Sequence, residues 1–119
     1  MAQEKGFVTE NSETVLTIEL STGSQIECVL DTGFNGFLLL PRMFIEDNSL
    51  DLVGRESVIM VEQNTIEIDV ASGEINWLGK TFSVRILVSE TDESLIGTQM
   101  LIDSLLEIDY KNLTVKITK

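Results

Sequence analysis

Apolar residues alternate with polar ones in several separate segments of this chain, and this period of two constrains the fold most strongly. In residues 16–20 leucine and isoleucine alternate with threonine and glutamate, and residues 26–30 repeat the pattern after an STGS turn. Further alternating segments cover residues 66–70, 84–88 and 113–117. Neighbouring side chains of a β-strand point to opposite faces, so these segments are predicted to be half-buried strands. The chain is therefore expected to be all-β, with its apolar strand faces turned to one core.

Helical patterns are scarce in comparison. Residues 42–47 are expected to form one short helix, and residues 98–105 (TQMLIDSL) a second, with Thr98 as its N-cap. The polar segments 48–55 and 90–94 are expected to be loops. The prediction is a β-rich domain with one or two short helices.

Length and composition favour a single domain. The chain has 119 residues, 43% of them hydrophobic and only one a proline, which is enough apolar material for a core. Neither a linker nor a low-complexity run divides the sequence. We expect one domain over residues 1–119, with residues 1–13 forming a flexible N-terminal arm.

The charge and the missing histidine exclude several functions. Twenty acidic residues against eight basic ones give a net charge of −12, and the chain has no histidine. Serine–histidine and cysteine–histidine catalysis are therefore impossible, and the commonest metal ligand is absent. Nucleic acid and anionic membranes would repel such a domain. We expect no nucleic-acid or membrane partner, no metal and no cofactor.

Cys28 is the only cysteine, so the chain can form no internal disulfide. Its place in an alternating segment favours a buried, structural side chain over a nucleophile. No segment approaches the roughly 20 apolar residues of a membrane span, and the first 14 residues lack the apolar run of a signal peptide. We expect a soluble, cytoplasmic protein.

One motif interrupts the strand pattern with a carboxylate. Residues 29–41 read VLDTGFNGFLLLP, so Asp31, Thr32 and Gly33 form a tight turn between two apolar runs. Residues 94–98 (SLIGT) repeat this pattern weakly, with an apolar pair leading into a glycine. An aspartate at the end of a buried strand has a fixed orientation. It is either a structural turn residue or half of a catalytic pair.

Two such carboxylates can hydrolyse peptides without histidine, metal or cofactor. One carboxylate takes a proton from water, while the other, protonated, polarises the carbonyl group that water attacks. The hydroxyl of Thr32 could form a hydrogen bond across a pair of such turns, and Gly33 would allow close approach of a substrate. Asp31, Thr32 and Gly33 are therefore the candidate catalytic residues.

From about Val15 to Ile117 the chain resembles the single-domain retropepsin-like (clan AA) aspartic proteases. The resemblance rests on Leu30-Asp31-Thr32-Gly33, Trp77-Leu78-Gly79-Lys80 and Leu95-Ile96-Gly97, which occur in that order with a hairpin region between the first two. The segment that follows Gly33 is similar to bacterial and archaeal members. The resemblance implies a partly closed barrel, aspartic endopeptidase activity, and a homodimer, as in the retroviral enzymes.

The resemblance also implies a flap, a hairpin that closes over the peptide, at about residues 57–68. The implied substrate-binding residues are Glu62, Gln63 and Asn64 at the flap tip and Phe34, Phe37 and Ile59 in side-chain pockets. Two features depart from the retroviral pattern. The flap tip is not glycine-rich, and Asn35 and Thr98 or Gln99 occupy the places of an acidic residue and an arginine that brace the dimer.

A chain with one Asp-Thr-Gly holds half a site, so catalysis demands that Asp31 meet its copy on a twofold axis. Such a dimer carries a charge of −24, twice −12. It should prefer basic or neutral peptides over acidic ones.

Two other functions are considered. The fold could serve as an inactive peptide-binding or dimerisation module, which the unusual flap tip favours. Alternatively, the chain could be a small acidic β-barrel that binds a basic protein, with Asp31 a simple turn residue.

Overall fold

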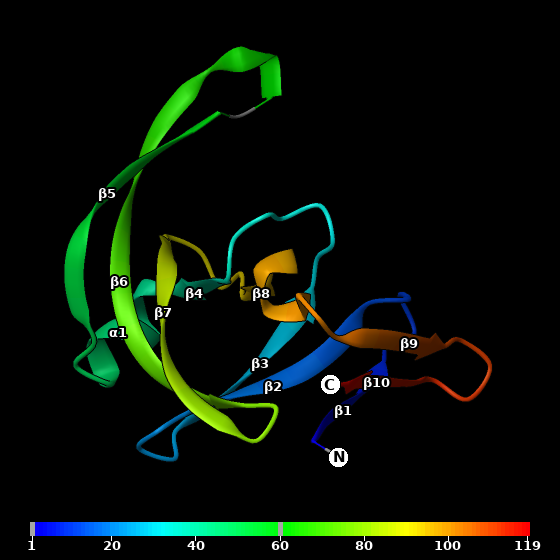
Figure 1. Cartoon of the computed structure of the whole chain (residues 1–119). Helices are drawn as coiled ribbons and strands as arrows, with labels where there is room; N and C mark the ends of the chain where they lie inside the picture. The colour runs from blue at the N-terminus through cyan, green and yellow to red at the C-terminus, as the bar shows by residue number, and fades with distance from the viewer. Residues whose placement is uncertain (1, 60) are drawn as a thin grey trace.

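The computed structural model describes residues 2–59 and 61–119, in which ten strands form one mixed sheet. The strands are β1 (Gln3–Val8), β2 (Thr14–Leu20), β3 (Gln25–Leu30), β4 (Leu38–Pro41), β5 (Asp51–Ile59), β6 (Thr65–Trp77), β7 (Lys80–Ser89), β8 (Leu95–Ile96), β9 (Leu105–Asp109) and β10 (Thr114–Thr118). Their order in the sheet is β5-β6-β7-β4-β8-β3-β2-β1-β10-β9. An additional pairing between β6 and β2 bends the sheet into a partly closed barrel (Figure 1). The predicted all-β class is confirmed.

The predicted hairpin of residues 16–30 is confirmed as β2 and β3, which pair with Ile18 opposite Ile26. The alternation has the expected physical cause, because Leu16, Ile18 and Leu20 point into the core and are almost completely buried. Cys28 lies in the same core, where burial raises the pKa of its thiol to about 12. The thiol is therefore not a nucleophile at neutral pH.

The centre of the fold is an interlocked group of short strands. The two-residue strand β8 runs parallel to β3, with Leu95 opposite Val29 and Ile96 opposite Leu30, and antiparallel to β4. Strand β4 in turn runs parallel to β7. Buried side chains from all four strands, including Leu38, fill the space beneath them. The two similar sequence segments noted above are thus neighbours in the sheet.

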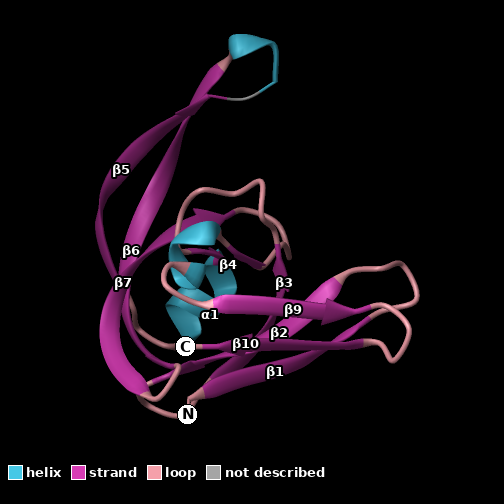
Figure 2. Ribbon diagram, turned by 45° about the vertical axis from the view of Figure 1, so that its right-hand side comes forward, coloured by secondary structure: helices cyan, strands magenta, loops and turns pink. Residues whose placement is uncertain are grey.

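Strands β5 and β6 form a long hairpin that rises from the body, and we call it the flap (Figures 1 and 2). The loop expected at residues 48–55 is wrong, because residues 51–55 belong to β5 and pair with β6. Most of the side chains of β5 are exposed, so its sequence shows no apolar alternation. Near the tip the chain forms a 3₁₀ turn, η1 (Val61–Gln63).

The first predicted helix is confirmed as α1 (Arg42–Asp47). The second, expected over residues 98–105, is wrong in length and type. Only a 3₁₀ helix, η2 (Thr98–Leu101), forms there, and its N-cap is Gly97 rather than Thr98. Asp103 takes a left-handed φ of 61°, which turns the chain into β9 at Leu105. A left-handed residue cannot continue a right-handed helix, so the helix ends early.

The N-terminal segment differs from the expected flexible arm, because residues 3–8 form β1. This strand pairs with β10 on one side and with β2 on the other. The two ends of the chain therefore lie close together, as Figure 2 shows. Within the described parts of the chain, no helix has the length and apolar composition to span a membrane.

Candidate active site

The turn at Asp31 is held by backbone hydrogen bonds to a distant segment. Asp31 follows β3, and its N–H donates to the carbonyl oxygen of Ile96 at 2.9 Å. The N–H of Gly33 donates to Oδ1 of Asp31 at 2.8 Å, and the N–H of Phe34 donates to the carbonyl oxygen of Asp31 at 3.0 Å. The carboxylate is thereby oriented by its own turn. Asp31 is half-buried, so its carboxylate is still accessible.

Gly97 locks the loop that follows Asp31. Its N–H donates to the carbonyl oxygen of Phe37 at 2.9 Å, and the N–H of Thr98 donates to that of Phe34 at 2.8 Å. A Cβ on Gly97 would lie 2.1 Å from the carbonyl oxygen of Gly36 and 2.8 Å from that of Phe34. Only glycine fits at this approach of two backbones. The glycine of the Leu95-Ile96-Gly97 motif therefore has a structural reason to be there.

The other residues of the turn face outward. Thr32 and Gly33 are exposed, and within the described part of the chain the Thr32 hydroxyl has no hydrogen-bond partner. Asn35 is exposed as well, and because Asn35, Thr98 and Gln99 are all uncharged, no ion pair can form between these positions. The open side of the turn thus presents a carboxylate, a hydroxyl and backbone.

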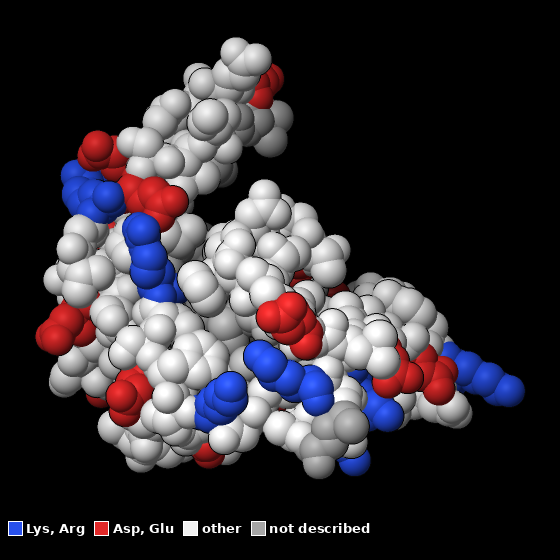
Figure 3. All heavy atoms as spheres, viewed as in Figure 1, with Lys and Arg blue, Asp and Glu red and all other residues white. Residues whose placement is uncertain are grey.

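Two hollows lie beneath the flap and share Phe34, Val58 and Leu87 in their walls. One has a volume of about 410 Å³ and is also lined by Gln99, so we call it the Gln99 hollow. The other has a volume of about 450 Å³ and is also lined by Glu93, so we call it the Glu93 hollow. Their size suits side chains of a bound peptide. Figure 3 shows the space between the raised flap and the body on one face.

The predicted binding residues lie in two places, the hollows beneath the flap and the exposed part of the flap itself. Phe34 lines both hollows, and Phe37 lines the Gln99 hollow. Ile59 is instead 75% exposed on the flap, and its neighbour Val58 lines the hollows. The remaining three, Glu62, Gln63 and Asn64, are exposed at the tip of the flap.

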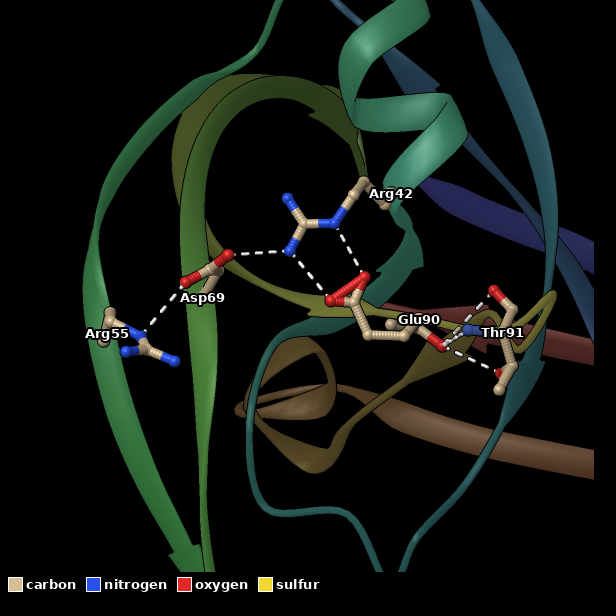
Figure 4. A network of polar contacts seen from close by, with 6 residues as sticks. Arg42, Arg55, Asp69, Glu90 and Thr91 are labelled. Atoms are coloured by element: carbon tan, nitrogen blue, oxygen red, sulfur yellow. Dashed lines mark hydrogen bonds and ion pairs between the residues drawn. The ribbon is translucent and has the colours of Figure 1, made fainter.

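Sequence reasoning missed a network of ion pairs at the base of the flap (Figure 4). Arg42, the first residue of α1, donates to Asp69 of β6 at 2.7 Å and to both oxygens of Glu90 at 2.6 and 2.8 Å. Arg55 of β5 pairs with Glu67 at 3.0 Å and with Asp69 at 3.2 Å. These residues come from separate segments, and no sequence spacing could have linked them.

The network changes the acidity of its carboxyl groups. Hydrogen bonds from Arg42 hold the pKa of Asp69 and of Glu90 below their ordinary values. Both carboxylates therefore remain charged at mildly acid pH, and the flap strands stay tied to α1 and to the end of β7. Residues 90–94 form the expected loop, and Glu90 within it is bound to Arg42 although its side chain is 66% exposed.

In the described part of the chain, no group of three or more Cys, Asp or Glu side chains is arranged to hold a metal ion. The chemistry that the site offers is that of a carboxylate on a fixed turn, below a flap and beside two hollows.

Comparison with solved structures identifies the architecture. The chain is similar to a retropepsin-like aspartic protease from Rickettsia conorii, with a TM-score of 0.64 and 17% sequence identity over 97% of this chain and 89% of that one. It is also similar to the protease of simian foamy virus (mac), with a TM-score of 0.55 and 18% identity over 73% of this chain and 90% of that one. The chain thus has a retropepsin-like fold.

Sequence comparisons alone detect no such similarity. No protein-family model and no curated protein matches the chain. With identities of only 17% and 18%, the likeness to the two solved structures is a likeness of fold.

Proposed function

We propose that this protein is an aspartic endopeptidase that acts as a homodimer. The observation that carries the proposal is the Asp31 turn, in which the carboxylate is fixed by Gly33 and the backbone is fixed to Ile96. Both structural neighbours are proteases, which supports the same activity. The cytoplasmic location expected above rests on the sequence alone.

In the proposed mechanism, two copies of Asp31 face each other across a twofold axis and share one proton. The charged carboxylate takes a proton from water as its oxygen attacks the scissile carbonyl carbon, and the protonated carboxyl protonates the carbonyl oxygen. The resulting diol then collapses: the carboxylate that gave up its proton takes one from a diol hydroxyl, the carboxyl that was protonated by water donates its proton to the nitrogen, and the C–N bond breaks to release the amine. Each chain supplies one carboxylate, so a monomer has no activity.

The substrate would lie extended between flap and turn. Backbone groups of the flap strands can bond to such a peptide as to an added strand, while the Gln99 and Glu93 hollows take alternate side chains. Phe34 borders both hollows and is placed to contact the peptide next to the scissile bond.

Asp31→Asn tests the proposal. Asparagine keeps the shape and the Gly33 hydrogen bond but cannot act as a base, so cleavage of unfolded protein should fall by about 10³-fold or more while the dimer remains. Sedimentation and a cleavage assay across pH 3–8 measure both. Asp47→Asn, which changes an exposed aspartate at the end of α1, is the matched control and should cleave normally.

A binding module is the second candidate function, and the flap tip favours it. Glu62 and Gln63 adopt left-handed φ angles of 67° and 61°, which glycine would adopt without strain. If the wild-type protein dimerises and binds peptides but never cleaves them, this second function holds and the peptidase proposal is wrong.

A further inference from the structure

The Glu93 hollow combines an apolar floor with a charged rim. Leu39, Val58, Ile68 and Leu87 are among its apolar lining residues and come from four different strands. Its rim carries four carboxylates and one guanidinium group, from Glu67, Asp69, Glu90, Glu93 and Arg55. The Gln99 hollow contains one carboxylate and one guanidinium group, Glu56 and Arg85, which pair with each other at 2.8 Å. The two hollows therefore differ in charge.

Acidic groups outnumber basic ones at the Glu93 hollow even when Arg42, which pairs with two of its carboxylates, is counted. Arg42 lies behind the wall, where it binds Asp69 and Glu90, and Arg55 binds Glu67 and Asp69. Four carboxylates against these two guanidinium groups leave two negative charges. Each arginine is paired with two of these carboxylates, so neither guanidinium is an unpaired positive charge at the hollow.

Glu93 is the carboxylate that remains open. Its backbone N–H donates to Oγ1 of Thr91 at 3.2 Å, which fixes the loop, and no ion pair of its carboxylate occurs among the described residues. Glu90 stands three residues earlier at the same rim with its side chain largely exposed. A positive group that enters the hollow along its apolar floor would meet these two carboxylates.

We propose that the Glu93 hollow is a specificity pocket for a lysine or arginine side chain of the bound peptide. This inference rests on the proposed function, because it assumes that a peptide lies beneath the flap. The aliphatic stem of such a side chain packs on Val58 and Leu87, and its charged end lies at the rim beside Glu93. A volume of about 450 Å³ accommodates the longest natural side chains. A glutamate in the same place is repelled.

Binding of labelled peptides tests the pocket without requiring cleavage. Fluorescein-labelled octapeptide pools are prepared with lysine, norleucine or glutamate fixed at one position and mixed apolar residues elsewhere. Norleucine has the stem of lysine without its charge. At one position the lysine pool should bind the full-length protein about threefold more tightly than the norleucine pool at low salt, as expected for a solvent-accessible ion pair. The preference should weaken in 0.5 M NaCl, because the Debye length falls from about 30 Å at 0.01 M salt to about 4 Å at 0.5 M.

Glu93→Lys should abolish or reverse this preference, and Glu93→Gln should reduce it. Glu10→Lys is the matched control, because it changes the net charge equally at an exposed turn between β1 and β2. If Glu10→Lys reduces the preference as much as Glu93→Lys, the effect belongs to the total charge and the pocket assignment is wrong. Equal binding of the lysine and norleucine pools, or no binding of any pool, also overturns it.

Measuring both binding and cleavage with the wild-type protein separates this inference from the proposed function, and Asp31→Asn should keep the lysine preference because it leaves the pocket intact. If the wild-type protein shows the Glu93-dependent lysine preference but cleaves no peptide, the pocket is retained and the peptidase is refuted. Cleavage without such a preference would retain the peptidase and refute the pocket.

Discussion

The turn at Asp31 and the tip of the flap are both connections between strands, and the chain holds them in different ways. A hydrogen bond from the Asp31 turn reaches Ile96, 65 positions along the chain, and the following loop is pressed against Gly97. Among the residues that the structure describes, the support near the flap tip comes from its own hairpin, whose last pair is Ile59 with Thr65. Long-range contacts therefore make the candidate catalytic group rigid, while local contacts leave the cover free to move.

Amide hydrogen exchange should show the largest difference between the two regions. The amides of Asp31 and Gly97 are bonded within the interlocked strands, so they should exchange only when the whole domain unfolds. Amides of residues 58–59 and 61–66 in the flap should exchange at least about 10³-fold faster through local opening. Exchange followed by NMR or mass spectrometry measures both rates. Equal protection in the two regions would contradict the comparison.

Gly97→Ala adds a methyl group where two backbone segments of the rigid region lie against each other. The added methyl group meets backbone oxygen atoms that cannot move independently, so we expect a loss of about 3 kcal/mol in the free energy of unfolding. Urea unfolding measures the change. Gly54→Ala, in β5 of the flap, is the matched control, because nothing lies within 4 Å of its added Cβ, and its effect should stay within about 0.5 kcal/mol. Similar losses in both variants would show that Gly97 is not a special contact.

Gln63→Gly probes the strained tip. A side chain at a left-handed φ costs about 1 kcal/mol, so glycine should relieve strain and stabilise the closed hairpin tip by up to that amount. The greater freedom of glycine in the open state offsets part of the gain. Slower exchange of the neighbouring flap amides, with unchanged global stability, is the expected result. Faster exchange would mean that the backbone at this position is not strained.

Arg42→Gln should have the smallest effect, and its effect depends on pH. Arg42 lowers the pKa of Asp69 and Glu90 from their ordinary values of 3.8 and 4.5, so the charged forms are favoured in the folded protein. This contribution to stability is complete above the ordinary values and is lost as the pH falls through the lowered ones. Wild-type protein should therefore exceed Arg42→Gln in stability near pH 7, and the difference should shrink below about pH 4. If the stability difference between the wild type and Arg42→Gln stays constant from pH 7 to below pH 4, Arg42 stabilises the fold through packing and not through its charge.

Sequence predicted those parts of the fold in which apolar side chains alternate or a motif has fixed spacing. The β2–β3 hairpin was predictable for this reason, helix α1 was expected directly after Pro41, and the place of the flap tip followed from the resemblance to retropepsin-like proteases. Strand β5 was not, because its mainly exposed side chains carry no alternation and its pairing with β6 alone makes it a strand. Likewise β1 lacks an apolar face that would distinguish it from a flexible arm.

The candidate site likewise contains residues that the sequence could predict and residues that it could not. The turn motif identified Asp31, and the second apolar pair with its glycine identified Gly97, since each depends on neighbours in sequence. The Arg42 network depends on β4, β6 and β7 being brought together by the fold. Its members are single charged residues whose neighbours in the sequence form no motif, so only the structure could show that they form one network.

The bond between Asp31 and Ile96 also sets an order of events during synthesis. A ribosome adds roughly 5–20 residues per second, so several seconds separate the appearance of Asp31 from that of its partner. The β2–β3 hairpin can form in that interval, but the turn at its end stays unfinished until β8 emerges and inserts between β3 and β4. Until then, no newly made chain holds the carboxylate in its folded position, so a growing polypeptide cannot carry a finished site.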